Sequence, residues 1–122
     1  MPQLIDLSTF GSEEGKLTVF EKILPGDLKR VFYIYGVLGD QERAKHGHIN
    51  ASNALIAVAG SCRIRVTQSG KQEETFILSS PSQALILPPG DWHVMDQFTP
   101  DAVLLVMSNQ YYDKNDYFFE KP

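Results

Sequence analysis

The chain has 122 residues, a net charge of −4, 43 % hydrophobic residues and 11 % aromatic residues. This composition predicts one folded domain over residues 1–122 and excludes a disordered chain. The acidic balance disfavours nucleic acid and anionic membranes as partners, since both select basic faces. No apolar run approaches the ~18 residues that a membrane helix needs.

One cysteine, Cys62, is present, so no internal disulfide can form. A lone thiol favours a reducing cytoplasm, and the first residues show no signal peptide. Because Cys62 lies in an alternating apolar run, we expect a small buried side chain there and not a nucleophile.

Short apolar runs follow one another along the chain, each ended by Gly, Pro, Asp or Ser. Several alternate or are rich in β-branched and aromatic residues, which is typical of strands. The expected strands lie at residues 17–23, 30–35, 54–59, 62–68, 75–78, 84–87 and 102–107. Only residues 111–119 suggest a helical turn. Strands at roughly ten-residue spacing predict an all-β sandwich or barrel.

All three histidines fall in two short stretches, residues 43–48 (RAKHGH) and 88–93 (PPGDWH). His46 and His48 are two residues apart, and in a strand such residues face the same side. With His93 they predict a cavity lined by imidazoles. A purely structural role is less favoured, since burying several imidazoles is costly.

These two stretches resemble the paired motifs of the cupin superfamily, His-x-His followed by Gly60 and then Pro-x-Gly-x-x-His. The resemblance implies a jelly-roll barrel of short antiparallel strands with these side chains pointing inward. Where a metal-binding cupin has Glu, this chain has Asn53. Three histidines can still hold zinc, iron or nickel, so a metal-dependent, dioxygenase-like enzyme stays open as an alternative. The missing carboxylate favours histidines that carry protons.

A narrower resemblance covers nearly the whole chain. Residues 28–34, 43–48, 60–62, 92–95, 101–106 and 111–117 are similar to the WxcM-like (FdtA-type) sugar-nucleotide 3,4-ketoisomerases. The tail YYDKNDY and the Trp-His-x-Met element are not general features of cupins, so they make the resemblance to this narrower family specific. The resemblance implies a cofactor-free, metal-independent homodimer whose N-terminal strands cross the interface. Its substrate would be a dTDP-linked 4-keto-6-deoxy sugar, in deoxysugar biosynthesis such as that of lipopolysaccharide.

Some positions depart from the family pattern. The family writes Arg-Gly-x-His-Ala-His, whereas this chain has Ala44 and Gly47 in place of the Gly and the Ala. Glu14 stands where a family arginine is expected, and Phe32 replaces the first residue of a Tyr-Tyr pair. These changes keep a second alternative open, a sugar-nucleotide-binding cupin without catalysis.

Moving a carbonyl from C4 to C3 of a sugar needs a base for the C3 proton and an acid at C4. A neutral imidazole with its ordinary pKa of ~6.5 can serve as both. The resemblance assigns His46 to the C3 proton and His48 to delivery at C4. We expect Tyr35 to join them as a relay or as a donor to the enediolate oxygens, although a core aromatic is an equal alternative.

The remaining predicted site residues bind the substrate. An arginine guanidinium matches the oxygens of a diphosphate, which favours arginine contacts to that group. The predicted binding residues are Arg43, Arg30, Tyr33, Asn53, Trp92 and His93. A surface role is an alternative for Arg30, and plugging the barrel mouth is one for Trp92. We expect Arg63 and Arg65 to lie on a solvated face.

Overall fold

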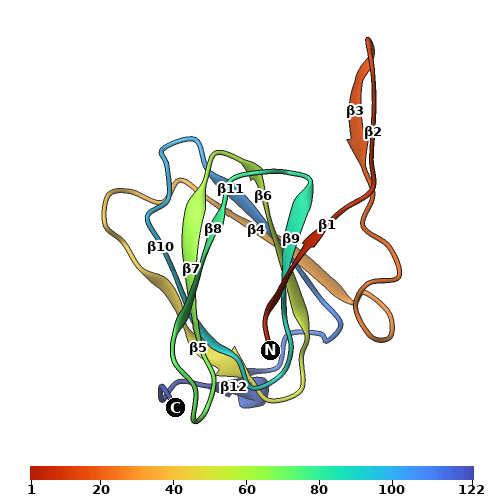
Figure 1. The fold of residues 1–122 in the computed structure, drawn as a ribbon. Coiled ribbons are helices and arrows are strands. Elements are labelled where there is room, and N and C mark those ends of the chain that lie inside the picture. The colour runs from red at the N-terminus through yellow and green to blue at the C-terminus, as the bar shows by residue number, and fades with distance from the viewer.

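Two five-stranded antiparallel sheets face each other in the computed structural model, which describes residues 1–122 (Figure 1). The first sheet has the order β1 (Gln3–Asp6), β9 (Gln83–Leu87), β6 (Asn53–Ala59), β11 (Val103–Ser108), β4 (Arg30–Tyr35). The second has the order β12 (Tyr117–Phe118), β5 (Arg43–His48), β10 (Trp92–Asp96), β7 (Cys62–Thr67), β8 (Glu74–Leu78). The predicted all-β jelly-roll barrel is confirmed.

Two further elements lie outside these sheets. Strands β2 (Thr9–Ser12) and β3 (Gly15–Thr18) form a hairpin that stands away from the barrel (Figure 1). One turn of 3-10 helix, η1 (Lys114–Asp116), precedes β12 at the other end and confirms the expected helical turn in the tail. With three residues it is the only helical element, so no helix has the length and apolarity to cross a membrane.

The core lies between the sheets. Alternate residues of the facing strands fill it, among them Leu55, Leu85, Leu104, Val106, Ile64, Leu78 and Met95. Each fully buried side chain of this size contributes about 1.5–3 kcal/mol. Cys62 is 2 % exposed within this cluster, and burial raises the pKa of its thiol to about 12. The expectation of a small buried cysteine is therefore confirmed.

The expected strand at residues 17–23 is wrong beyond Thr18. The Val19 amide still donates to the Ser8 carbonyl at 2.9 Å, but the chain then leaves the hairpin. Leu24 is buried with Phe20 and Ile23 packed around it, on the outer face of the first sheet. The apolar alternation there serves packing against a sheet and not pairing within one.

A β-bulge shapes the strand that carries two of the histidines. His46 lies opposite His93 on β10, while Ala44 lies opposite Val94, so Lys45 is an extra residue. Ala44 and Lys45 have φ of +69° and +57°, in the left-handed region. Each such residue costs about 1 kcal/mol or more. Bulges re-aim side chains, and this one lies directly before His46.

A tight turn between β9 and β10 fixes the third histidine. Gly90, with φ of +91°, donates its amide hydrogen to the His48 carbonyl at 2.8 Å. This bond holds the turn against the end of β5, so β10 starts in register with it. His93 consequently faces His46 across the ladder.

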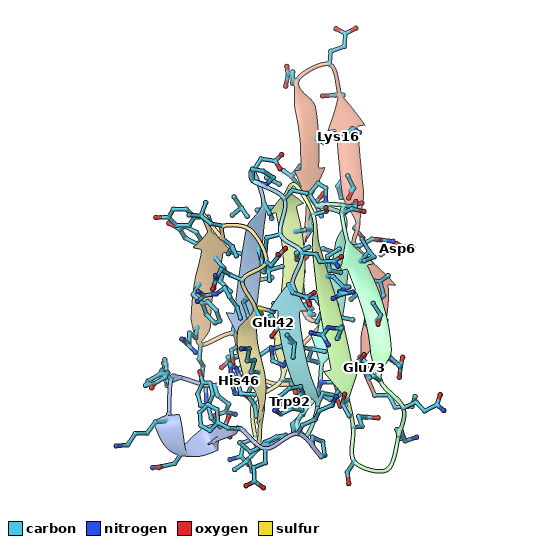
Figure 2. The ribbon with its side chains drawn as sticks, turned by 90° about the vertical axis from the view of Figure 1, so that its left-hand side faces the viewer. Asp6, Lys16, Glu42, His46, Glu73 and Trp92 are labelled. Carbon is cyan, nitrogen blue, oxygen red and sulfur yellow. The ribbon has the colours of Figure 1, made fainter.

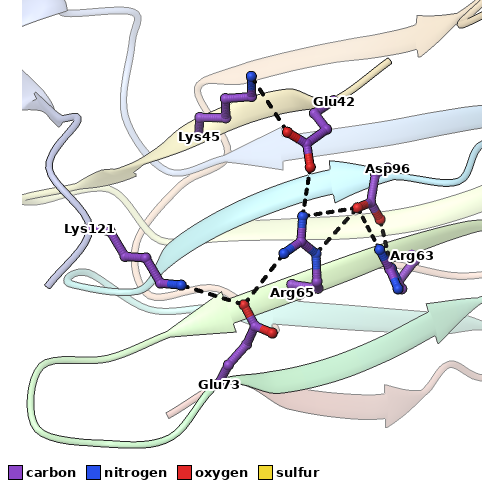
Figure 3. Close-up of polar contacts among 7 residues, drawn as sticks. All are labelled: Glu42, Lys45, Arg63, Arg65, Glu73, Asp96 and Lys121. Atoms are coloured by element: carbon purple, nitrogen blue, oxygen red, sulfur yellow. Dashed lines mark hydrogen bonds and ion pairs between the residues drawn. The ribbon is translucent and has the colours of Figure 1, made fainter. Parts of the chain in front are cut away.

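Arg63 and Arg65 lie on the outer face of the second sheet, where they form an ion-pair network (Figure 3). The buried Asp96 carboxylate accepts two hydrogen bonds from each guanidinium, at 2.8–3.2 Å. The hydrogen bonds from Arg63 are the main reason why the pKa of Asp96 lies below its usual range. These contacts fix β7 against β10, the strand that carries His93.

Candidate active site

A cavity of about 140 Å³ lies between the two sheets, lined by residues of β4, β5, β6, β10, β11 and β12. It lies at the end of the barrel opposite the hairpin, where Figure 2 shows His46. The predicted site residues that line it are Arg30, Arg43, His46, His48, Asn53 and His93. The structure therefore brings together residues from four strands that the sequence separates.

The three imidazoles pack edge to face. The His46 ring lies 5.1 Å from that of His48 and 5.2 Å from that of His93, between centroids. His46 Nδ1 is 3.1 Å from the Ala44 carbonyl oxygen. Because a carbonyl only accepts, Nδ1 carries the hydrogen, and Nε2 is left as the basic nitrogen. No group of three His, Cys, Asp or Glu side chains is arranged to hold a metal ion.

Asp116 is a site residue that the sequence analysis did not single out. Its buried carboxylate lies 3.3 Å from His48 Nδ1 and also accepts from the Asn50 and Ala51 amides at 2.6 and 3.3 Å. A carboxylate acceptor places the hydrogen of His48 on Nδ1 and leaves Nε2 basic. One side chain thus connects the tail, the turn after β5 and a histidine of the cavity.

Tyr117 is the second residue that was missed. Its ring lies 4.7 Å from the His46 ring and 4.5 Å from the His48 ring, between centroids. Arg30 Nη1 donates to its hydroxyl oxygen at 3.3 Å. Asp116 and Tyr117 both belong to the YYDKNDY tail. The resemblance of this tail to the family was the signal that could have identified them, but nothing in the sequence places the tail beside β5.

Burial controls the charge of the histidines. It is the main cause that lowers the pKa of His46 to about 4 and that of His93 to about 3, and neighbouring imidazoles add to it. Burial also lowers the pKa of His48, while the Asp116 carboxylate opposes part of that shift. All three imidazoles are therefore neutral at pH 7. Of the two on β5, His48 has an anion that stabilises its protonated form.

Acid should unfold the protein through these imidazoles. Since the folded pKa of His93 is depressed, unfolding takes up a proton between pH ~3 and ~6.5, and stability is lost as pH falls through this window. We expect His93 alone to lower the free energy of unfolding by about 1.4 kcal/mol per pH unit there. Urea denaturation across this range measures the slope. A flat profile below pH ~6.5 would contradict the expectation.

Two predicted site residues on β4 lie outside the cavity. Tyr33 and Tyr35 are 63 % and 68 % exposed on the outer face of the first sheet, where their rings stack 5.9 Å apart. Phe32 and Ile34 take the inward positions and line the cavity. The prediction that places Tyr33 and Tyr35 in this cavity is wrong, because strand pleating turns the other half of β4 inward.

Trp92, predicted to contact the substrate, is not among the residues that line this cavity. Its indole is 9 % exposed, and Nε1 donates to the Phe119 carbonyl at 3.1 Å. Lys121 Nζ lies 5.8 Å from the ring centroid. Trp92 and His93 are neighbours on one strand and so point to opposite faces. Trp92 anchors the tail that carries Asp116 and Tyr117.

Gly47 makes room for the tail. Strand β12 pairs with β5, Phe118 opposite Gly47, and a Cβ on Gly47 would overlap the Phe118 ring and lie 3.0 Å from the Asp91 carbonyl. We expect Gly47→Ala to displace β12, lowering stability by about 1–3 kcal/mol and turnover with it. Thermal unfolding and turnover measure both effects. The double variant Gly47→Ala/Phe118→Ala removes the overlap and should recover stability relative to Gly47→Ala, and equal losses would contradict this.

A family model and a curated relative match nearly the whole chain. The family model described as WxcM-like, C-terminal (FdtA) matches residues 1–121. The chain is 32 % identical over 117 residues to TDP-4-oxo-6-deoxy-alpha-D-glucose-3,4-oxoisomerase of Aneurinibacillus thermoaerophilus, covering 94 % of this chain and 84 % of the relative.

Solved structures show the same likeness. The fold is similar to that of WlaRA, a TDP-fucose-3,4-ketoisomerase from Campylobacter jejuni, with TM-score 0.90, 33 % identity and coverage of 98 % and 89 % of the two chains. It is similar to that of QdtA, a sugar 3,4-ketoisomerase from Thermoanaerobacterium thermosaccharolyticum in complex with TDP, with TM-score 0.92, 37 % identity and coverage of 98 % and 88 %. Since the family model spans nearly the whole chain, this protein belongs to the WxcM-like, FdtA family.

Proposed function

We propose that this protein is a sugar-nucleotide 3,4-ketoisomerase that moves the keto group of a dTDP-4-keto-6-deoxyhexose between C4 and C3. The observation that carries the proposal is the pair of neutral imidazoles, His46 and His48, side by side in one cavity with their Nδ1 atoms already bonded. The similar proteins are named as TDP-sugar ketoisomerases, which supports the substrate class.

The reaction balances without a cofactor. A base removes the C3 proton, the C3–H electrons form a C3=C4 double bond, and the C4 carbonyl electrons move onto its oxygen. The C3 hydroxyl then passes its proton to the C4 oxygen, its O–H electrons form the new C3 carbonyl, and the electrons of the C3=C4 double bond take up a proton at C4. Hydrogen positions change, but no net oxidation of the sugar occurs. An imidazole beside each carbon performs both transfers.

His48 is the better candidate for the C3 base. Its Nδ1–H lies beside the Asp116 carboxylate, and an anion there stabilises the imidazolium that forms when Nε2 takes a proton. His46 has only the Ala44 carbonyl, and its pKa of about 4 means that its Nε2, once protonated, gives up the proton more readily than an ordinary imidazolium. We therefore reverse the assignment from the resemblance: His48 takes the C3 proton, and His46 serves C4.

The arginines bind the diphosphate in this proposal. Arg43 is exposed and Arg30 half-buried, and both line the cavity. They therefore place positive charge where the diphosphate of a bound nucleotide would extend out of the cavity. The Arg30 guanidinium is held over the Phe32 ring at 4.4 Å and the Tyr112 ring at 5.2 Å. His93 and Asn53 face the sugar, His93 as an orienting donor and Asn53 as a hydrogen-bonding amide.

Incubation with dTDP-4-keto-6-deoxyglucose in deuterated water tests the proposal. We expect a 3-keto product and deuterium at the carbons that exchange. Saturable TDP binding with neither product nor exchange would reject catalysis and favour the non-catalytic alternative. Activity that disappears on chelation and returns with iron, zinc or nickel would favour the metal-dependent alternative.

We also propose a homodimer, formed through the outer face of the first sheet. The hairpin exposes Phe10 and Leu17, and β4 exposes Val31, Tyr33 and Tyr35. A two-stranded hairpin is marginally stable by itself, and an apolar face of this extent is rare on monomers. A groove of about 440 Å³ beside the hairpin offers a place for a second copy.

Sedimentation analysis of the chain tests this association. We expect a dimer, and we expect Tyr33→Asp to shift it toward monomer because a carboxylate would be buried at the contact. Leu38→Asp is the matched control, since Leu38 is 78 % exposed in the loop after β4. A monomeric wild type, or equal effects of the two changes, would overturn the proposal. The single free cysteine supports a cytoplasmic location, which we also propose.

A further inference from the structure

The only hydroxyl group among the residues that line the cavity belongs to Tyr117. We propose that this hydroxyl is the catalytic donor that holds the substrate oxygen on which charge develops during isomerisation. The inference rests on the proposed function and adds a tail residue to its catalytic groups.

The geometry around Tyr117 prepares its hydroxyl for this role. The ring lies against both His46 and His48, so its position is fixed beside the two groups that move protons. Arg30 Nη1 donates to the phenolic oxygen at 3.3 Å. Since the oxygen accepts that bond, the hydroxyl hydrogen remains available to point at a ligand.

The composition of the cavity leaves few other donors. Phe32 takes the inward position on β4 that a tyrosine holds in the family pattern, and it has no hydroxyl. The other lining side chains are apolar, apart from the arginines, the histidines and Asn53. If His46 and His48 move protons at carbon, the C4 oxygen on which negative charge develops needs a separate donor.

The step that Tyr117 assists is the formation of the enediolate. As Nε2 of a histidine takes the C3 proton, electrons move through C3=C4 onto the C4 oxygen. The Tyr117 O–H donates a hydrogen bond to that oxygen as the negative charge appears. When the C3 hydroxyl passes its proton to the C4 oxygen, the new C3 carbonyl forms and C4 takes up a proton, the charge returns to neutral and the phenol keeps its hydrogen.

Tyr117→Phe tests the proposal, because it removes one oxygen and keeps the ring against the histidines. We expect kcat to fall by about 10²-fold, as when one oxyanion donor is lost, with TDP affinity unchanged. Deuterium incorporation at C3 should fall in parallel, since the same enediolate precedes both. Tyr111→Phe is the matched control, because Tyr111 is 72 % exposed in the same tail, and it should keep wild-type kcat.

A second variant tests the hydrogen bond from Arg30 to the Tyr117 hydroxyl. Arg30→Met removes the guanidinium that supports the phenol, and its effect on kcat should shrink in the Tyr117→Phe background. Turnover of Tyr117→Phe within about threefold of wild type would overturn the inference. So would a loss explained entirely by weaker TDP binding. Failure of wild type to isomerise at all would instead reject the proposed function itself.

Discussion

Replacement of His48 by Asn is expected to lower turnover by about 10³-fold while TDP still binds. Asn keeps part of the hydrogen bonding to Asp116 but has no nitrogen that titrates near neutral pH. The His48 side chain is only 12 % exposed, so only a small substrate or solvent can reach it. Steady-state kinetics and TDP titration measure the two effects separately.

His46→Asn provides the matched comparison on the same strand. If His48 takes the C3 proton, the His46 variant should still wash deuterium into C3 of recovered substrate while product formation falls. The His48 variant should lose both signals. The reverse pattern would return the C3 base to His46, and wild-type turnover in the His48 variant would remove that residue from the mechanism.

Several strands of the barrel follow from local patterns, whereas β1 and the hairpin do not. Residues 30–35, 54–59 and 84–87 are apolar or alternating, and each forms the strand that its pattern predicts. Strands β1 and β2 are short and mixed in composition, and β1 is defined by pairing with β9, far along the chain. Such pairing depends on tertiary context that no local window contains.

The histidine cavity could be predicted because its signal is a spacing. His46-x-His48 fixes a shared face in any strand, and His93 sits at a recognisable turn. Which face of β4 points inward is a different question, since Phe32 and Tyr33 are equally suited to either. Register decides it, and a shift of one residue exchanges the two sets. This is why Tyr33 and Tyr35 were placed wrongly.

The tail residues were missed for another reason. Asp116 acts on His48 across 68 positions of sequence, and it lies in one turn of 3-10 helix with no periodic pattern. Its role becomes visible only when β12 pairs with β5 and the Trp92 indole holds the Phe119 carbonyl. The spacing of His46 and His48 therefore predicts only part of the site, and the pairing of β12 with β5 adds the rest.

Asp116→Asn should damage stability and turnover together. The oxygen that remains can accept from the Asn50 amide, but an NH₂ group then faces the Ala51 amide and His48 Nδ1. An unpaired buried donor costs about 1–3 kcal/mol. If the NH₂ instead donates to Nδ1, the imidazole must carry its hydrogen on Nε2, and the base is lost. We expect kcat to fall by at least about 10²-fold.

Asp113→Asn is the control for this change. Asp113 is exposed in the same tail, and its side chain accepts only from the Asn115 amide at 2.9 Å. Asn is as good a cap as Asp, so stability and kcat should stay near wild type. Urea denaturation and turnover of both variants give the comparison. If Asp116→Asn unfolds earlier but retains wild-type kcat in the folded range, the carboxylate is a structural cap alone, and His48 does not depend on it for its tautomer.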